Sequence, residues 1–193
     1  MIKAAIFGAS GYTGQELIRI LSGHPDVKLV AATSRRFAGQ EVSTVFPALQ
    51  GLTALKYQNA KPGEICRLCD VVFLALPHGV SMDMAPEFIN AGKTVIDLSA
   101  DYRLRDLKIY EVWYGKHASA KFIKNAVYGI PELYRQKIKK TKFVANPGCY
   151  PTGIILGLAP ALKKQLLDVS TIIADSASGV SGEIGRASCR ERV

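Results

Sequence analysis

Cys149 is the residue of this chain best suited to covalent chemistry. It lies in Asn146-Pro147-Gly148-Cys149-Tyr150-Pro151-Thr152, after the short apolar run 143–145 and before the long apolar run 153–162. The first run is typical of a strand and the second of a buried helix. Cys149 is therefore expected at the first turn of that helix, where unpaired N–H groups and the helix dipole stabilise an anion. A thiolate in this place is suited to attack an acyl carbon. The alternative is a small buried apolar residue, the commoner fate of a cysteine.

A glycine-rich turn near the start of the chain indicates a nucleotide site. The apolar run 2–7 predicts a strand, Gly8-Ala9-Ser10-Gly11-Tyr12-Thr13-Gly14 follows at once, and apolar residues within 15–22 recur at helical spacing. Strand, glycine turn and helix form the context of a dinucleotide-binding turn, although the spacing here is G-x-x-G-x-x-G. Glycines let the backbone approach a pyrophosphate, and the helix N-terminus supplies N–H donors. An ordinary tight turn is the alternative.

The residues after the second predicted strand, 28–33, favour NADP over NAD. A site for NAD offers an acidic side chain to the ribose hydroxyls at this point. This chain instead has Thr33-Ser34-Arg35-Arg36. Hydroxyl and guanidinium groups suit the additional 2′-phosphate of NADP. Two solvated arginines are the alternative.

Three further strands are predicted, at 71–76, 94–98 and 142–145. Pro77-His78-Gly79 follows the first of them and 99–103 follows the second, at the edge where an α/β sheet binds its ligands. Arg103 is thus a candidate clamp for a phosphate or carboxylate, or equally one half of a surface ion pair. For the remaining chain we expect an irregular surface excursion, a turn, and a strand opening a new layer, at 110–122, 128–133 and 170–175 respectively.

The composition indicates a globular protein. The chain has 193 residues, of which 48% are hydrophobic and 21% charged, values typical of a folded domain. Its formal net charge is +9, but the basic residues do not alternate with aromatic ones as on a single-strand binding surface, so no nucleic-acid partner is expected. Glycine interrupts the start too early for a signal peptide, and no apolar run reaches the roughly 20 residues of a membrane helix. We therefore expect a soluble, cytoplasmic protein.

The cysteines do not indicate a metal or a disulfide framework. Four cysteines in a chain of this size are too few for such a framework. Cys66 and Cys69 form a C-x-x-C pair, but a zinc site would need a second pair or a nearby histidine. The pair lies just before the strand predicted at 71–76, so packing explains it better.

Taken together, these motifs resemble the N-acetyl-gamma-glutamyl-phosphate reductases, enzymes of arginine biosynthesis. The aspartate-semialdehyde dehydrogenases share the architecture and the cysteine chemistry but fit the motifs less well. The matches occur in order over nearly the whole chain: GASGYTG at 8–14, TSR at 33–35, LPHG at 76–79, DLSADYR at 97–103, YGIPEL at 128–133, NPGCYPT at 146–152 and SGVSG at 178–182.

The resemblance implies an α/β fold with two parts. Residues 1–148 would form an NADP-binding domain with a Rossmann-like, doubly wound parallel sheet. Residues 149–182 would begin an α+β catalytic and dimerisation domain, and the intact enzyme would be a homo-oligomer, a tetramer. Residues 183–193 match nothing in the family and are expected to be a non-native tail.

The resemblance also implies a mechanism. Cys149 would attack the acyl phosphate and expel phosphate, NADPH would reduce the resulting thioester, and the semialdehyde would leave. Arg103 and Asn146 would contact the substrate. The cofactor would be bound by residues of four loops: Gly8, Ser10, Gly11, Tyr12, Thr13, Gly14, Ser34, Arg35, Pro77, His78, Ser181 and Gly182.

The chain departs from the family in length. Members are considerably longer, and a catalytic histidine comes from the part that has no counterpart here. His24 and His117 match no motif, and His78 belongs to the cofactor loop. We therefore expect this chain by itself to be inactive or nearly so, and Cys189, in the tail, to have no function.

Two other functions remain open. A lysine-pathway reductase would act on an N-acyl-aminoadipyl phosphate, one methylene longer, and the residues that would tell the two substrates apart are not legible in the sequence. A non-catalytic NADP-binding module would keep the fold without the chemistry. Replacing Cys149 by alanine separates enzyme from module, because only the enzyme would lose acyl transfer.

Overall fold

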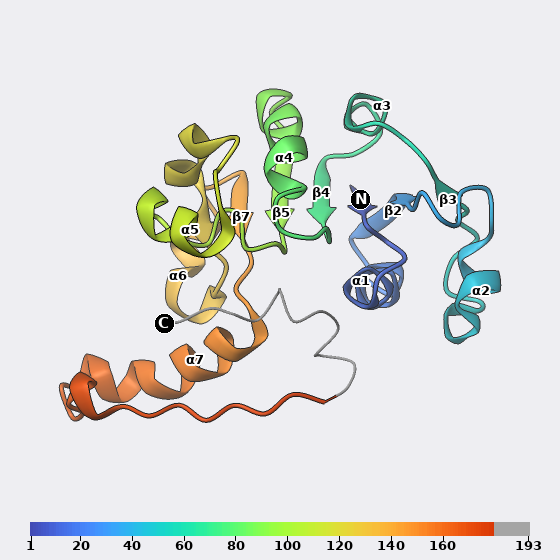
Figure 1. Cartoon of the computed structure of the whole chain (residues 1–193). Helices are drawn as coiled ribbons and strands as arrows, with labels where there is room; N and C mark the ends of the chain where they lie inside the picture. The colour runs from blue at the N-terminus through green and yellow to red at the C-terminus, as the bar shows by residue number, and fades with distance from the viewer. Residues whose placement is uncertain (180–193) are drawn as a thin grey trace.

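The computed structural model describes residues 1–179 of the chain (Figure 1). Its centre is a seven-stranded sheet of the order β3-β2-β1-β4-β5-β7-β6. Every neighbouring pair in it is parallel. The strands are β1 (Ile2–Phe7), β2 (Val27–Thr33), β3 (Tyr57–Gln58), β4 (Val71–Leu74), β5 (Thr94–Asp97), β6 (Val127–Tyr128) and β7 (Phe143–Ala145).

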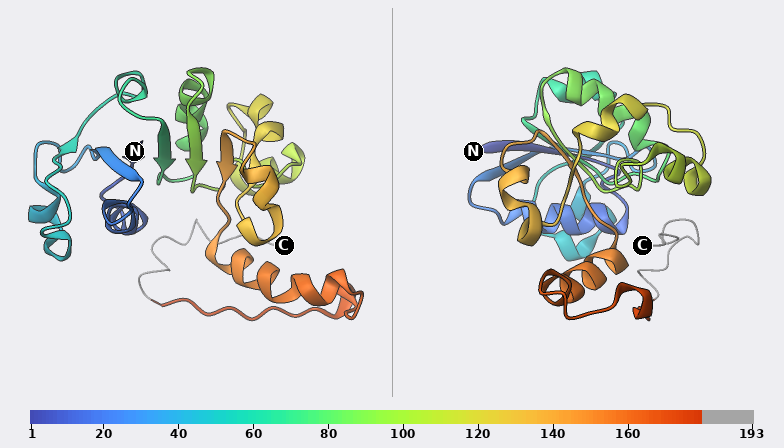
Figure 2. Two further views of the ribbon diagram at one scale, coloured as in Figure 1. Left: turned by 180° about the vertical axis from the view of Figure 1, so that it is seen from behind. Right: turned by 90° about the vertical axis from the view of Figure 1, so that its left-hand side faces the viewer.

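Helices cover both faces of this sheet (Figure 2). They are α1 (Tyr12–Ser22), α2 (Val42–Val45), α3 (Pro62–Cys66), α4 (Ser81–Asn90), α5 (Leu107–Tyr114), α6 (Pro131–Ile138) and α7 (Cys149–Lys163), with 3₁₀ turns η1 (Pro47–Leu49), η2 (Ala120–Asn125) and η3 (Val169–Thr171). The chain builds outward from β1 in both directions, with a switch point between β1 and β4. This is the doubly wound arrangement that the sequence predicted.

Each face of the sheet carries its own apolar core because successive strand residues point to opposite sides. In β1, Ala5 and Phe7 pack into one cluster, with Phe88 of α4, whereas Ala4 and Ile6 pack into the other. The rings of Phe7 and Phe88 meet edge to face at 5.5 Å between centroids. Cys66 and Cys69 belong to the first cluster. Burial raises the pKa of both thiols, that of Cys69 to about 11, as expected for packing residues.

The expectation of an irregular excursion at 110–122 is wrong. Helix α5 occupies Leu107–Tyr114, and Asp106 caps it by accepting hydrogen bonds from Lys108 N at 2.8 Å and Ile109 N at 3.4 Å. Tyr110 is fully buried and His117 nearly so. The N-cap signal at Asp106 was present in the sequence, but the burial of these polar aromatic residues depends on contacts with distant segments.

The segment 128–133, expected to be a turn, also contains the end of a strand and the start of a helix. Tyr128 ends the edge strand β6, which pairs with β7. Pro131 then begins α6 at a position where its missing N–H has no cost. A two-residue strand is too short to be recognised by periodicity.

The region after β7 differs most from expectation. Helix α7 was expected to be buried, but Pro151 is its only buried residue. Within the described chain, 170–175 is not a strand: η3 is followed by an irregular segment that runs beside α7 (Figure 1). Ile154, Ile155, Leu156 and Leu158 are only partly buried, so the hydrophobic residues of α7 predict a helix correctly but not its full burial.

Candidate active site

The loops that carry the predicted site residues within 1–179 all leave the same edge of the sheet. Backbone hydrogen bonds run across this edge, from the first or second residue after one strand to the last residue of a neighbouring strand. They include Ala9 N to Thr33 O at 2.9 Å, Ala75 N to Phe7 O at 2.9 Å, Leu98 N to Leu74 O at 3.0 Å and Asn146 N to Asp97 O at 2.7 Å. The exits of β1, β2, β4, β5 and β7 are therefore fixed side by side. Helix α7 begins at this same edge (Figure 1).

The glycine turn after β1 is built for close backbone approach. Gly8 has a φ of +77°, and a Cβ there would overlap the carbonyl oxygen of Ala75. A Cβ on Gly14 would lie 2.5 Å from Gly8 O. Gly11 is the N-cap of α1, which has no side-chain capping hydrogen bond. The first N–H groups of α1 are therefore without a side-chain cap, as a phosphate site requires.

The serine expected to recognise NADP is joined to the glycine turn. Ser10 Oγ and Ser34 Oγ are hydrogen-bonded at 2.8 Å, and Ser34 Oγ also accepts from Phe37 N at 3.3 Å. Arg35 and Arg36 are both exposed, and the Arg36 guanidinium lies 5.0 Å from the centroid of the Phe37 ring. Contact of Arg35 with a 2′-phosphate stays a prediction.

The turn and the α1 N-terminus also expose the remaining predicted cofactor contacts, Tyr12 and Thr13. Pro77 and His78 follow β4, across the switch point from that turn. The His78 ring meets the Tyr114 ring of α5 at 5.4 Å between centroids. Gly79, with a φ of +84°, then donates its N–H to Asp101, which is fully buried. Sequence analysis quoted Asp101 within DLSADYR but gave it no role, because a carboxylate's partner 22 residues away leaves no local pattern.

Cys149 lies where the sequence placed it, at the first residue of α7. Gly148 is the N-cap, and no side chain caps the helix. Thr152 closes the first turn, its N–H and its hydroxyl donating to Gly148 O at 3.1 and 2.7 Å. The thiol is free and exposed, so the alternative of a buried apolar cysteine is wrong for this structure. A reagent can reach the sulfur.

The two residues predicted to contact substrate, Arg103 and Asn146, are brought together, but through the main chain. Arg103 Nε donates to Asn146 O at 2.8 Å and its Nη2 donates to Leu98 O at 2.9 Å. Asn146 Nδ2 donates to Pro147 O at 3.1 Å. The guanidinium thus joins the loop after β5 to the loop that carries Cys149. Their contact with a substrate stays a prediction.

The segment 128–133 packs closely against the residues that precede Cys149, and Gly129 makes this packing possible. Its N–H donates to Ala145 O at 2.8 Å. A Cβ on Gly129 would lie 2.9 Å from Val144 Cγ1 and 3.2 Å from Asn146 Cα. The glycine therefore lets β6 and its exit lie directly against the loop that leads to Cys149. The glycine is visible in the sequence, but its contact with residues 144–146 is not.

A buried carboxyl lies at the end of β5, beneath the same loops. Asp97 is completely buried, and this burial raises the pKa of its carboxyl to about 6, against the lowering effect of hydrogen bonds from Ser99. Ser99 donates its N–H at 3.2 Å and its hydroxyl at 2.7 Å. The loop 98–103 is thus anchored at its start by a titratable group.

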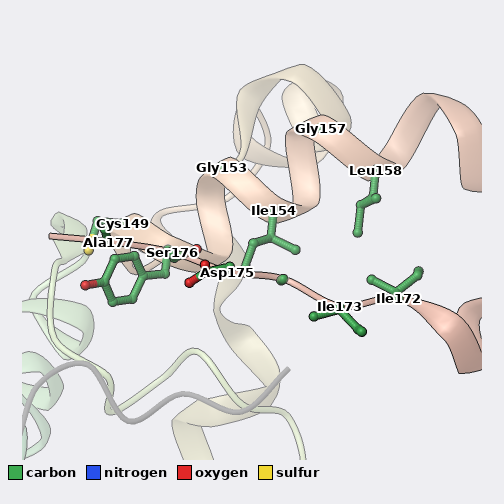
Figure 3. A pocket seen from close by; sticks show the side chains of 12 residues that line it. Cys149, Gly153, Ile154, Gly157, Leu158, Ile172, Ile173, Asp175, Ser176 and Ala177 are labelled. Carbon is green, nitrogen blue, oxygen red and sulfur yellow. The ribbon is translucent and has the colours of Figure 1, made fainter.

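An open groove runs from Cys149 along α7 (Figure 3). Its volume is about 640 Å³, and its walls are α7 and the segment 172–177. The lining is mainly apolar, with Ile154, Leu158 and Ile173 among its side chains. Ser181 and Gly182, predicted to bind the cofactor, lie outside the described residues, as does Cys189.

The histidines do not pair with the cysteine in this structure. Within residues 1–179, no hydrogen bond joins Cys149 to His24, His78 or His117. His24 Nδ1 accepts from Asp26 N at 3.1 Å, and His117 is held in the core by Asp101 and Ser119. No cluster of metal-ligating side chains and no helix long and apolar enough to cross a membrane occurs in this part of the chain.

A glycine turn at the switch point of a doubly wound sheet, with an exposed thiol at the same edge, is typical of one class: dinucleotide-binding α/β proteins with a cysteine in the site. Sequence comparison identifies the family within that class. Residues 3–141 match the NAD binding domain of semialdehyde dehydrogenase, and residues 149–190 match its dimerisation domain. The chain belongs to the semialdehyde dehydrogenase family.

The similar curated proteins are reductases. The chain is 53% identical over 182 residues to the N-acetyl-gamma-glutamyl-phosphate reductases of Geotalea daltonii and Desulfotalea psychrophila. Each alignment covers 94% of this chain and 53% of the relative. The chain therefore spans about half the length of the curated relatives it matches.

Solved structures share the fold. Aspartate semialdehyde dehydrogenase with NADP from Candida albicans has a TM-score of 0.61 at 24% identity, covering 86% of this chain and 48% of that one. Aspartate semialdehyde dehydrogenase II from Vibrio cholerae has a TM-score of 0.62 at 18% identity, covering 85% and 43%. These similarities support the Rossmann-like architecture and nothing finer.

Proposed function

We propose that this protein acts in the NADPH-dependent reduction of N-acetyl-gamma-glutamyl phosphate to N-acetylglutamate 5-semialdehyde, a step of arginine biosynthesis. The carrying observation is the exposed Cys149 at the N-terminus of α7, in a chain 53% identical to reductases named for this substrate. Since the chain spans about half of those relatives, the proposal concerns the activity of the whole protein.

Cys149 is the nucleophile in this proposal. Its thiolate attacks the acyl carbon, the carbon–oxygen bond to phosphate breaks, and phosphate leaves with the electron pair. A thioester remains on the sulfur. The N–H groups of Cys149 and Tyr150 belong to the N-terminus of α7, which no side chain caps, and they would stabilise negative charge that develops beside the sulfur during attack.

The residues present fit a bound dinucleotide. The uncapped N-terminus of α1, approached through Gly8, Gly11 and Gly14, suits its pyrophosphate, and Ser34 with Arg35 suits a 2′-phosphate, which favours NADP. Pro77, His78, Ser181 and Gly182 remain predicted contacts of the cofactor. NADPH held by these residues would supply the hydride for reduction of the thioester, and Cys149 would be released as the thiolate when the aldehyde leaves.

Two finer points belong to the same proposal. The match of residues 149–190 to a dimerisation domain supports self-association, and we expect a homotetramer. Cys66, Cys69 and Cys149 are free thiols, and reduced thiols persist in the cytoplasm, so we expect a cytoplasmic protein. The boundary between the two parts near residue 148 and the non-native character of 183–193 stay predictions.

Acylation of the chain tests the chemistry directly. Freshly generated N-acetyl-gamma-glutamyl phosphate should add one acyl group to the chain, seen as a mass increase that hydroxylamine removes. Cys149→Ala should abolish the adduct and retain NADPH binding. An adduct that persists in Cys149→Ala, or no adduct on the whole protein of which this chain is part, would contradict the proposal. The homologous N-acyl-aminoadipyl phosphate, tested at the same concentration, decides whether the longer substrate is accepted equally.

A further inference from the structure

Helix α4 lacks a cap of its own. Its N-cap residue is Val80, which makes no side-chain capping hydrogen bond. The first N–H groups of a helix have no partner inside it and need one elsewhere. Asp101 supplies that partner from the loop after β5. Its two oxygens accept from Gly79 N at 2.8 and 3.0 Å, and Oδ2 also accepts from Met82 N at 2.9 Å.

Asp101 is itself held on every side. It has no exposed surface, and its Oδ1 accepts from the Tyr110 hydroxyl at 2.9 Å. Its main-chain oxygen is 2.7 Å from His117 Nε2, while His117 Nδ1 accepts from Ser119 N at 3.1 Å. Nδ1 is therefore the acceptor and Nε2 the donor of a neutral ring. The carboxylate cannot shift without breaking several of these bonds.

This network fixes the His78 loop by two routes. One runs through Gly79, the residue after His78, directly to the carboxylate. The other runs through α5: Tyr110 stacks on Tyr114 at 5.1 Å between centroids, and Tyr114 contacts the His78 ring. The position of His78 is thus a consequence of Asp101.

Arg103, two residues after Asp101 in the same loop, contacts the loop that leads to Cys149. Arg103 donates to Asn146 O at 2.8 Å, three residues before Cys149, and to Leu98 O at 2.9 Å at the start of its own loop. A planar guanidinium serves both carbonyls at once, which a single ammonium on a flexible stem does less well. The loop 98–103 therefore contacts the cofactor loop with one side chain and the nucleophile loop with another.

We propose that the loop 98–103 is a brace that sets the position of the loop 77–79 relative to the loop 146–148, with Asp101 and Arg103 as its positioning residues. The identity of the cofactor rests on the proposed function, but the brace does not. Misplacement of reacting groups by about 1 Å can cost about a hundredfold in rate. A loop that ties the two halves of the site together therefore has a direct effect on chemistry.

Asp101→Asn is the sharpest variant, because it keeps the shape but leaves one uncharged oxygen to accept from Gly79 N, Met82 N and the Tyr110 hydroxyl, which the two carboxylate oxygens now share. Amide hydrogen exchange at Gly79 and Met82 should become at least about tenfold faster, as expected when charge-assisted hydrogen bonds are lost. The NMR signal of the His78 ring should shift. Asp70→Asn is the matched control: Asp70 also accepts a main-chain N–H, from Lys3 at 2.9 Å, at the opposite edge of the sheet.

Asp70→Asn should leave the Gly79 and Met82 exchange rates and the His78 signal unchanged. Equal effects of the two variants, or none from Asp101→Asn, would overturn the brace. If the Asp101→Asn variant fails to fold, amide hydrogen exchange in the unchanged chain still tests the brace. Gly79 and Met82 amides exchanging as fast as those of an exposed loop would also refute the role of Asp101.

Two further measurements test the roles of Asp101 and Arg103 separately: the Kd for NADPH and the rate at which iodoacetamide alkylates Cys149. Asp101→Asn should raise the Kd for NADPH about tenfold. Arg103→Lys should change the alkylation rate of Cys149, followed by peptide mass mapping, about tenfold and leave the Kd within about twofold. An unaltered alkylation rate would overturn the role of Arg103. An unchanged chain that does not bind NADPH would refute the proposed function, while the exchange experiment would still decide the brace.

Discussion

The buried carboxyl of Asp97 should make the stability of this chain depend on pH in an unusual direction. Burial raises the pKa of this group from 3.8 to about 6 in the folded chain. A raised folded pKa means that the folded state holds its proton more tightly than the unfolded one. The stabilising contribution is therefore complete below about pH 4 and is lost as the pH rises through about 6.

The size follows from the shift. A change from 3.8 to about 6 corresponds to about 3 kcal/mol, since one pKa unit is worth about 1.4 kcal/mol. Asp97→Asn removes the titration and keeps an oxygen that can accept from Ser99. The free energy of unfolding of the unchanged chain, relative to Asp97→Asn, should fall by about 2 kcal/mol between pH 4 and pH 7, which is most of that total.

Urea unfolding at half-unit pH intervals measures this difference, and other titrating groups cancel because both proteins carry them. Ser99→Ala provides a second check on the cause. The Ser99 hydroxyl donates to Asp97 at 2.7 Å and lowers the carboxyl pKa, so its loss should move the transition to higher pH. A stability difference between the unchanged chain and Asp97→Asn that stays constant from pH 4 to pH 7 would refute the reasoning.

Three further outcomes are expected. Gly129→Ala should cost about 1–3 kcal/mol in urea unfolding, because the new methyl group overlaps Val144, and should alter Cys149 alkylation; an effect on neither would contradict the packing described. Arg35→Ala should weaken NADPH binding about tenfold in a fluorescence titration, the loss of one charge-assisted contact, and leave NADH binding unchanged; equal weakening of both would exclude a 2′-phosphate contact. Phe88→Ala should destabilise the chain by about 3–5 kcal/mol, because the ring is fully buried against Phe7, and a loss below about 1 kcal/mol would place the core elsewhere.

The sequence predicted much of the fold because parallel strands leave a strong local signal. Runs such as 2–7 and 71–76 are apolar on both faces, and their strands, β1 and β4, form within those limits. The glycine turn was recognised because strand, glycines and helix follow one another directly. The weaker elements had no such signal: β6 has two residues, and α5 is rich in aromatic residues that pack only in the folded chain.

For the site, the sequence by itself determined the candidates whose role is set by neighbours along the chain. Cys149 follows a strand and begins a helix, so local order was enough to place it at an uncapped helix N-terminus. The glycine turn and Ser34 were found in the same way. Their chemistry depends on backbone geometry that a few consecutive residues impose.

Only the tertiary structure decided how these candidates are held together. Asp101 caps a helix 19–22 residues earlier, Arg103 reaches a carbonyl 43 residues later, and Gly129 is required by its contact with Val144 and Asn146. The same folding left α7 largely uncovered, although its sequence indicated a buried helix. Partners of this kind are chosen by the packing of distant segments, and a hydrogen bond between them leaves no period or spacing in the sequence.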